Sequence, residues 1–212
     1  MVHKTKYTFS FTGASALITE TLVIAEEYNS LKDWKAVEKS LVEKNLLNKV
    51  KRATFKREFS EIRKRLSLLT NDQLYLMIHG SFDDSKAMIL LALVKTYSFL
   101  SDFIVEVIRN KYLLFDTVIS DIDYIRFVNA KSLSHNELNV ITEVTAKKVK
   151  QRVFKILEQV GLITQAKNGN ILKPILNSKV IDVIIDDDPA LLSAFLFSNE
   201  EIKTLIRKLK HA

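Results

Sequence analysis

The chain has 212 residues, of which 47% are hydrophobic and 27% are charged, and it contains only 4 Gly and 2 Pro. This composition is ordinary for a soluble globular protein, and so few turn-forming residues argue against a β-sandwich or a barrel. The absence of Cys excludes disulfides and thiolate metal sites and is consistent with an intracellular protein. The sequence therefore predicts a mainly all-α fold of one or two domains.

The net charge of +7 is concentrated in two segments. Residues 49–65 hold eight Lys or Arg against two Glu, and residues 143–174 hold seven against two, which gives local charges of +6 and +5. The remainder of the chain is therefore acidic on balance. Localised positive charge of this kind is typical of a surface that binds a polyanion such as nucleic acid.

No stretch of the sequence is typical of a membrane protein. Lys4 and Lys6 precede polar residues and not the apolar segment of a signal peptide. The most apolar run, residues 87–94, ends at Lys95, whereas a membrane-spanning helix needs about 20 apolar residues. We therefore expect a cytoplasmic protein without membrane contact.

Residues 1–118 are predicted to form an N-terminal helical bundle. The pattern indicates an extended arm that ends at Gly13, after which apolar residues recur at helical spacing. The pattern breaks around residues 115–120, where we place a domain boundary. Helices are expected over residues 14–30, 33–47, 54–69, 71–80 and 83–97, followed by a helix that includes residues 101–102 and ends near residue 111.

Residues 119–174 are predicted to form a winged helix-turn-helix, the unit that lays one helix in a DNA groove. A first helix over residues 121–130 is followed by a short helix after Ser134 and then by a long helix. Either Thr142 or Thr145 can serve as the N-cap of the long helix, because a hydroxyl there accepts a bond from an unpaired backbone N–H.

The end of the long helix is predicted to lead into a β-hairpin wing. Gly161 follows the last helical residue, where a left-handed conformation stops a helix. Two short extended runs then flank the turn at Lys167-Asn168-Gly169, and Asn and Gly tolerate the positive φ that a tight hairpin requires.

The long helix carries the argument for DNA. Five Lys or Arg lie between Lys147 and Lys155 with no acid among them, on the side opposite an apolar stripe. We expect Thr145, Lys147, Lys148 and Gln151 to lie nearest the base edges, and the other cations and the wing to contact the DNA backbone. The residues expected to contact double-stranded DNA are His135, Thr145, Lys147, Lys148, Lys150, Gln151, Arg152, Lys155, Lys167, Asn168 and Asn170.

A less specific interpretation of the same residues is a solvated surface helix followed by an ordinary hairpin, because charged helix faces commonly serve solubility alone. The absence of acids between Lys147 and Lys155, and the order helix, turn, helix, hairpin, favour DNA binding over that alternative.

The second basic segment is predicted to bind nucleic acid or a partner protein. Its cations lie off the apolar stripe of the helix over residues 54–69, and Glu58 and Glu61 partly neutralise them. A solvated helix face is therefore the alternative here. The residues of this second basic patch are Lys49, Lys51, Arg52, Lys56, Arg57, Arg63 and Lys64.

The C-terminal segment, residues 175–212, is predicted to end in two helices. Pro189 fits the first turn of the first helix, with Asp188 as its cap, and the second begins at Asn199. The acidic run that ends at Asp188 could gather Mg²⁺, but consecutive side chains diverge, so a solvated turn is the better interpretation. No phosphate loop, nucleophile motif or metal-ligand spacing is present, and we expect no catalytic activity, no metal and no cofactor.

Several blocks resemble the BrxA family of the BREX phage-defence systems. They are FTGASALITETLVIAEEY at residues 11–28, TFKREFSEIRKRL at 54–66, KSLSHNEL at 131–138 and KQRVFKILEQVGLI at 150–163. The resemblance covers most of the chain but includes no catalytic motif. It implies an all-helical protein that binds double-stranded DNA, with an N-terminal part similar in fold to the RNA antitermination factor NusB. The alternatives that it leaves open are RNA binding and a scaffold that docks on other BREX proteins.

Overall fold

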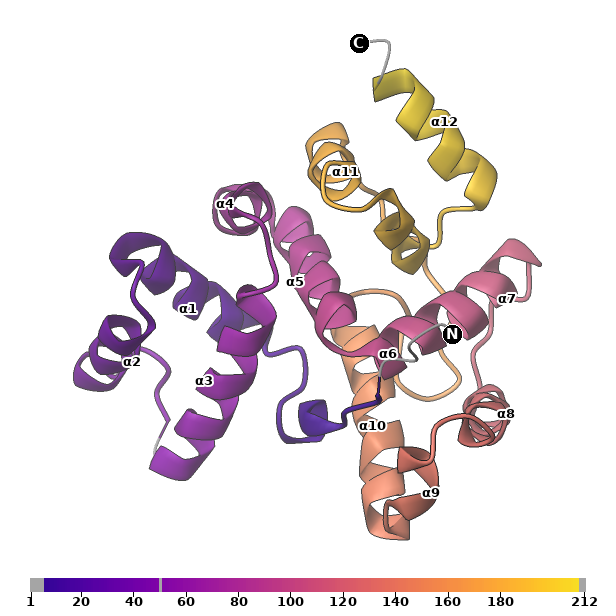
Figure 1. Ribbon diagram of the computed structural model, residues 1–212, viewed down its shortest axis with the longest axis horizontal. Helices are drawn as coiled ribbons and strands as arrows, with labels where there is room; N and C mark the ends of the chain where they lie inside the picture. The colour runs from indigo at the N-terminus through magenta and orange to yellow at the C-terminus, as the bar shows by residue number, and fades with distance from the viewer. Residues whose placement is uncertain (1–5, 50, 210–212) are drawn as a thin grey trace.

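The computed structural model describes residues 6–49 and 51–209 (Figure 1). Within this part of the chain the molecule is built of helices, and its only β pairing consists of two isolated antiparallel bridges. The prediction of a mainly all-α fold is confirmed. Residues 1–5, which include the start of the expected arm and Lys4, lie outside the described residues.

Helix α5 is the centre of the N-terminal half, and every residue from 87 to 94 is buried. Polar caps start this helix and two of its neighbours in sequence: the Asp33 side chain accepts the Ala36 N–H, while Thr70 and Ser81 form capping boxes, the latter at the start of α5. The helices are α1 (Ile18–Leu31), α2 (Trp34–Glu43), α3 (Arg52–Leu66), α4 (Asn71–His79), α5 (Phe82–Thr96) and α6 (Ser98–Phe103), which continues through the π-helical turn η2 (Ile104–Ile108) into α7 (Arg109–Leu113).

No single helix in the described part of the chain is long and apolar enough to cross a membrane. Helix α5 and the helix from Ser98 to Leu113 have the necessary length and composition only together, as a pair bent by 111°. The bend lies at Tyr97, which is buried and ends one helix where the next begins.

The second half of the chain lies on the other side of α5 in Figure 1. The expected cap at Asp188 is confirmed, since its carboxylate accepts the Ala190 N–H at 2.9 Å. The helix it starts is a 3-10 helix. The elements are α8 (Asp121–Ser132), α9 (Glu137–Val140), α10 (Glu143–Gln159), α11 (Ser178–Ile185), the 3-10 helix η3 (Pro189–Phe195) and α12 (Asn199–Leu209).

Two predictions for the N-terminal arm are wrong. Residues Ser10–Gly13 form a 3-10 turn, η1, where the end of an extended arm was expected, and α1 begins at Ile18 and not near residue 14. The cause is a buried arginine: Arg65 Nη1 and Nη2 donate to the carbonyls of Ser15 and Ala14, each at 2.7 Å. Carbonyls directed at a guanidinium are not free to accept the bonds of a helix, so α1 starts only after them.

Arg65 is 1% exposed and is held on its other side by Tyr97, the residue between α5 and α6. Its Nε donates to the Tyr97 hydroxyl at 3.0 Å, and that hydroxyl donates to the Glu61 carboxylate. Burial, together with the Glu61 carboxylate, raises the pKa of Tyr97 above its ordinary value, so the hydroxyl keeps the proton that it donates. The positive charge of Arg65 is therefore surrounded by acceptors.

The same arm segment is bound from the opposite side by α10. The Gln159 Oε1 accepts the Ala16 N–H at 3.1 Å. Residues 14–16 therefore tie α3 to α10, with η1 lying between these helices in Figure 1. We call Arg65, Gln159 and the backbone of residues 14–16 the arm clamp.

The buried core continues across residues 115–120, where the sequence pattern breaks. Ile119 donates its N–H to the Gly169 carbonyl at 3.1 Å, and the rings of Phe103 on α6 and Phe154 on α10 lie 6.2 Å apart. Aromatic side chains join the arm, α6, α8 and α10 into one cluster: Tyr7, Phe9, Phe11, Phe99, Phe103, Tyr124, Phe127 and Phe154.

Replacing Arg65 tests the arm clamp. The variant Arg65→Met leaves the carbonyls of Ala14 and Ser15 without the donor they have in the parent, and we expect the free energy of unfolding to fall by about 3 kcal/mol. Urea denaturation followed by circular dichroism measures this. The control is Arg63→Met, an exposed arginine on the same helix, for which we expect a loss below about 1 kcal/mol. Equal losses in the two variants would contradict the role given to Arg65.

Candidate nucleic-acid interface

Helix α10 begins at Glu143, directly after one of the two candidate caps. The Thr142 hydroxyl accepts the Thr145 N–H at 3.2 Å, so of the two candidate caps the structure uses Thr142. The Thr145 hydroxyl lies 2.9 Å from that of Thr142 and takes part in the same cap. Below it, Val149, Val153, Ile156 and Leu157 are buried, as the apolar stripe predicts.

The opposite face of α10 carries the predicted cations. Lys148, Gln151 and Lys155 are exposed, and Arg152 is partly exposed. Their spacing of three and four residues places them in one row along the helix. We call these four residues the α10 row.

Some cations of α10 form ion pairs with nearby acids, and others do not. Lys147 pairs with Glu143 at 2.7 Å, Lys150 pairs with Asp121 of α8 at 2.7 Å, and Lys155 pairs with Glu158 at 2.6 Å. Exposed pairs one turn apart are weak and exchange readily with another anion. Within the described residues neither Lys148 nor Arg152 has a carboxylate within ion-pair distance, so these two cations are the best placed to meet an external anion.

The segment after α10 turns back on itself but forms no strand in the described residues. Gly161 has a φ of 80°, the left-handed conformation that was predicted. The Thr164 N–H donates to the Asn170 carbonyl at 2.9 Å, and Ile163 and Ile171 form an isolated antiparallel bridge. The expected hairpin thus appears as a single bridge with its flanking bonds.

The turn itself differs from the expectation in one respect. Asn168 adopts a positive φ of 49°, but Gly169 does not. Gly169 is required for space instead, because a Cβ there would lie 2.2 Å from the Gln165 carbonyl oxygen. Lys167, Asn168 and Asn170 are exposed on this turn, as the prediction requires.

His135 is placed where it does not meet a phosphate, which corrects the prediction for this residue. Its side chain is 7% exposed, its ring stacks on that of Tyr7 at 3.7 Å, and its Nδ1 lies 3.1 Å from the Glu137 carboxylate. The same carboxylate accepts the Tyr7 N–H. His135 therefore attaches the N-terminal arm to the start of α9.

The arm brings the two basic segments together. Arg57 of α3 lies against Gly13, where a Cβ would meet the Arg57 side chain at 2.8 Å. On the other side, Thr12 and the α10 row line a hollow of about 480 Å³. The basic faces of α3 and α10, separate in sequence, therefore flank the same short turn. Nothing in the sequence marked Thr12 for this position, because the contact joins residues more than a hundred positions apart.

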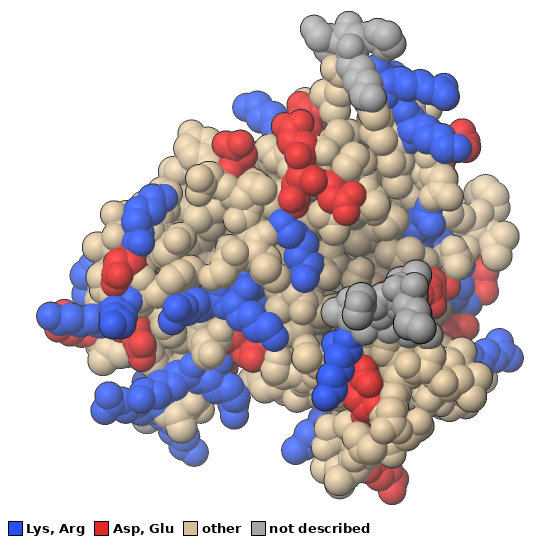
Figure 2. All heavy atoms as spheres, viewed as in Figure 1, with Lys and Arg blue, Asp and Glu red and all other residues tan. Residues whose placement is uncertain are grey.

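Some residues of the second basic patch contact other side chains of this chain, and others extend into solvent. Lys49 is bound by Glu20 at 2.8 Å and Glu58 at 3.0 Å, which keeps its pKa above its ordinary value. Arg63 lies over the Trp34 ring and Lys64 over the Tyr97 ring. The remaining members, Lys51, Arg52, Lys56 and Arg57, are exposed. Figure 2 shows basic side chains gathered over the half of the molecule that holds α2 and α3.

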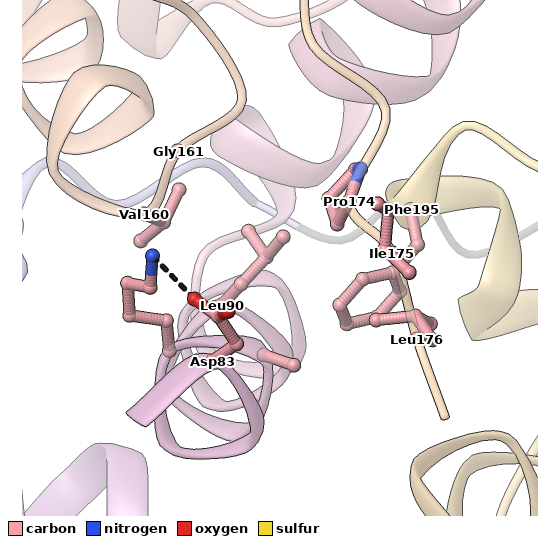
Figure 3. A pocket seen from close by; sticks show the side chains of 10 residues that line it. Asp83, Leu90, Val160, Gly161, Pro174, Ile175, Leu176 and Phe195 are labelled. Carbon is pink, nitrogen blue, oxygen red and sulfur yellow. Dashed lines mark ion pairs between the residues drawn. The ribbon is translucent and has the colours of Figure 1, made fainter. Parts of the chain in front are cut away.

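The described residues contain no group of three His, Asp or Glu side chains arranged to hold a metal ion. The cavity in Figure 3, of about 160 Å³, lies between α5, the end of α10 and η3. Its lining is mostly apolar, and its charged residues, Asp83 and Lys86, pair with each other at 2.8 Å. This cavity does not offer the convergent polar groups of a reaction site.

Known proteins resemble this chain in sequence and in fold. The family model BrxA matches residues 5–188. A protein of Bacillus cereus (strain H3081.97) named BREX protein BrxA is 27% identical over 154 residues, which are 72% of this chain and 76% of that protein. A protein of the same name from Escherichia coli O9:H4 (strain HS) is 24% identical over 159 residues, 75% of each. The crystal structure of an uncharacterized protein from Magnetospirillum magneticum shares the fold, with a TM-score of 0.78, 20% identity, and coverage of 91% of this chain and 98% of that one.

The attachment of the arm at His135 makes a prediction for stability at low pH. Burial raises the pKa of Glu137, but the bonds from the Tyr7 N–H and the His135 ring outweigh it and hold that pKa below the ordinary 4.5. A carboxyl with a lowered pKa stabilises the folded state above about pH 4.5, and the contribution is lost as the pH falls through the folded-state value. We expect Glu137→Gln to be less stable than the parent protein at pH 7, with the difference shrinking toward pH 3 in urea titrations. A difference that stays constant with pH would contradict this assignment.

Proposed function

The chain belongs to the BrxA family, and from that premise we propose that it is a non-catalytic protein that binds double-stranded DNA in BREX phage defence. The curated relatives carry BREX in their names, so other proteins of that system are its expected partners. The proposal requires no metal and no cofactor.

The observation that carries the proposal is the α10 row. Lys155 follows Lys148 by seven positions, which is a rise of about 10 Å along the helix. A major groove is about 12 Å wide and has phosphates along both edges. A helix whose exposed face carries cations over that length can lie in the groove, with charged ends on phosphates and Gln151 directed at the base edges.

The elements on both sides of α10 support a winged helix-turn-helix docking mode. Helices α8 and α9 precede α10, and the exposed turn at Lys167 and Asn168 follows it. In this mode α10 enters the groove and the turn contacts the adjacent backbone. Since we assign the cations of the α10 row mainly to phosphates, which carry no sequence information, we expect little sequence preference.

The exposed cations of α3 extend the proposed surface. Arg57 lies across the arm from the α10 row, so a duplex that covers α10 passes close to Lys56 and Arg57. The alternatives are an RNA ligand for α3 and a scaffold role in which the basic faces dock on an acidic protein. If RNA competes with duplex DNA of equal length, that result together with the exposed patch on α3 favours the RNA alternative over the scaffold.

Salt dependence of binding tests the role of the α10 row. Replacing Lys148, Arg152 and Lys155 with Ala removes up to three phosphate contacts, and each contact contributes about 0.9 to the slope of log affinity against log salt. We therefore expect the slope to become shallower by about 2 to 3, measured by fluorescence anisotropy on a labelled duplex at several salt concentrations.

The matched control is the triple Ala variant of Lys203, Arg207 and Lys208 on α12, which loses the same formal charge at the opposite end of the molecule in Figure 1. Its slope should stay close to that of the parent. An unchanged slope and affinity in the α10 variant, or an equal change in the α12 variant, would contradict the proposed interface.

Competition with RNA makes a separate prediction. Duplex DNA should compete better than a single strand or an RNA of equal length, and replacing Lys56 and Arg57 with Ala should weaken duplex binding less than the α10 variant does, because α3 lies at the edge of the proposed footprint. RNA that competes better, with loss on changing α3 alone, would favour the alternative.

A further inference from the structure

A groove of about 800 Å³ lies between α4 and α11, away from the proposed DNA interface. In Figure 1 these two helices lie on the upper side of the molecule, while η1, α9 and most of α10 lie on the lower side. The groove therefore stays accessible when α10 holds a duplex. The residues used below are Asp72, Tyr75, His79, Lys179 and Asp182, all of which line it.

Partly buried hydrogen bonds fix both ends of the groove. At one end, the Gln73 side chain donates to the Val183 carbonyl at 2.9 Å and to the Asp187 carboxylate at 3.1 Å. At the other, the Asn177 amide donates to Asp84 at 2.6 Å, and Asp84 also accepts the Ser81 N–H at 2.9 Å. Helices α4 and α11 are thus held antiparallel at a set spacing, and the groove is formed before any partner binds.

The walls combine carboxylates with an exposed aromatic ring. Tyr75 is 62% exposed, and its ring lies 4.4 Å from that of His79. Asp72 is exposed and Asp182 is partly buried, and neither has an ion pair with a described residue. Lys179 is the one cation among the residues that line the groove. Acids without cationic partners beside an open aromatic face are a complementary setting for a cation.

The charge around the groove is also opposite to that of the chain as a whole. The net charge is +7, yet Asp186 continues the acidic side of α11 one turn after Asp182. The C-terminal end of α11 adds the partial negative charge of the helix dipole. Figure 2 shows one group of acidic side chains on the upper part of the molecule, where α11 lies.

We propose that the groove between α4 and α11 is a docking site for a positively charged segment of a partner protein, with Lys or Arg side chains at Asp72 and Asp182 and over the Tyr75 ring. Apolar side chains of the segment contact Leu76 and Val183 on the floor. Nucleic acid is disfavoured here because its phosphates would face Asp72 and Asp182.

The test uses the full chain and a short fluorescein-labelled peptide in which Arg and Leu alternate. A twin peptide has Glu in place of Arg. We expect the Arg peptide to bind with an affinity that falls as salt is added, and the Glu peptide not to bind. The double variant Asp72→Asn and Asp182→Asn, and separately Tyr75→Ala, should each weaken binding about tenfold.

The matched control is Glu26→Gln with Glu38→Gln, two acids on α1 and α2 that do not line the groove. It should bind the Arg peptide as the parent does. Weakening by less than about twofold in both groove variants, or equal weakening in the control, would overturn the proposal. The groove variants should keep the parent's duplex affinity, so a failure of the groove is distinguishable from a failure of the DNA proposal; urea titrations verify that each variant is folded.

Discussion

The arrangement of the molecule depends on the hydrogen bonds that the buried guanidinium of Arg65 donates. A charge with 1% exposure is costly unless acceptors surround it. Here the acceptors are the carbonyls of residues 14–16 and the Tyr97 hydroxyl. Satisfying Arg65 therefore fixes the path of the arm, and the arm in turn binds Gln159 of α10. One buried cation thereby positions α3, the arm and the candidate DNA-binding helix relative to one another.

This arrangement explains how two basic segments about a hundred residues apart come to flank one hollow. The arm clamp is built around the buried Arg65, whereas Arg57 is exposed and Thr12 and the α10 row line the hollow at the surface. Rigid supports of this kind hold charged side chains at a constant spacing, which favours contact with the regular phosphates of a duplex. The acidic groove between α4 and α11 lies on another side, so nucleic acid and a cationic protein segment are expected to use separate surfaces.

Local sequence patterns predicted the helical class, the N-cap at Asp188, the left-handed Gly161 and the buried stripe of α10, because each depends on neighbours within a few residues. Long-range bonds determined what the patterns missed. Residues 14–16 have helical character but give their carbonyls to Arg65, and His135 looked like a polar surface residue but stacks on Tyr7. For the candidate site, the exposed row was predictable from helical spacing, whereas the meeting of α3 and α10 at the arm was not.

DNA binding through α10 is measured most directly by photocrosslinking from a benzophenone side chain introduced at position 151, in the middle of the α10 row, to a labelled DNA duplex. We expect a crosslink from position 151 and from position 12, and none from position 72 in the groove between α4 and α11. A bound duplex that crosslinks from position 72, or that binds without crosslinking from position 151, would contradict DNA binding through α10.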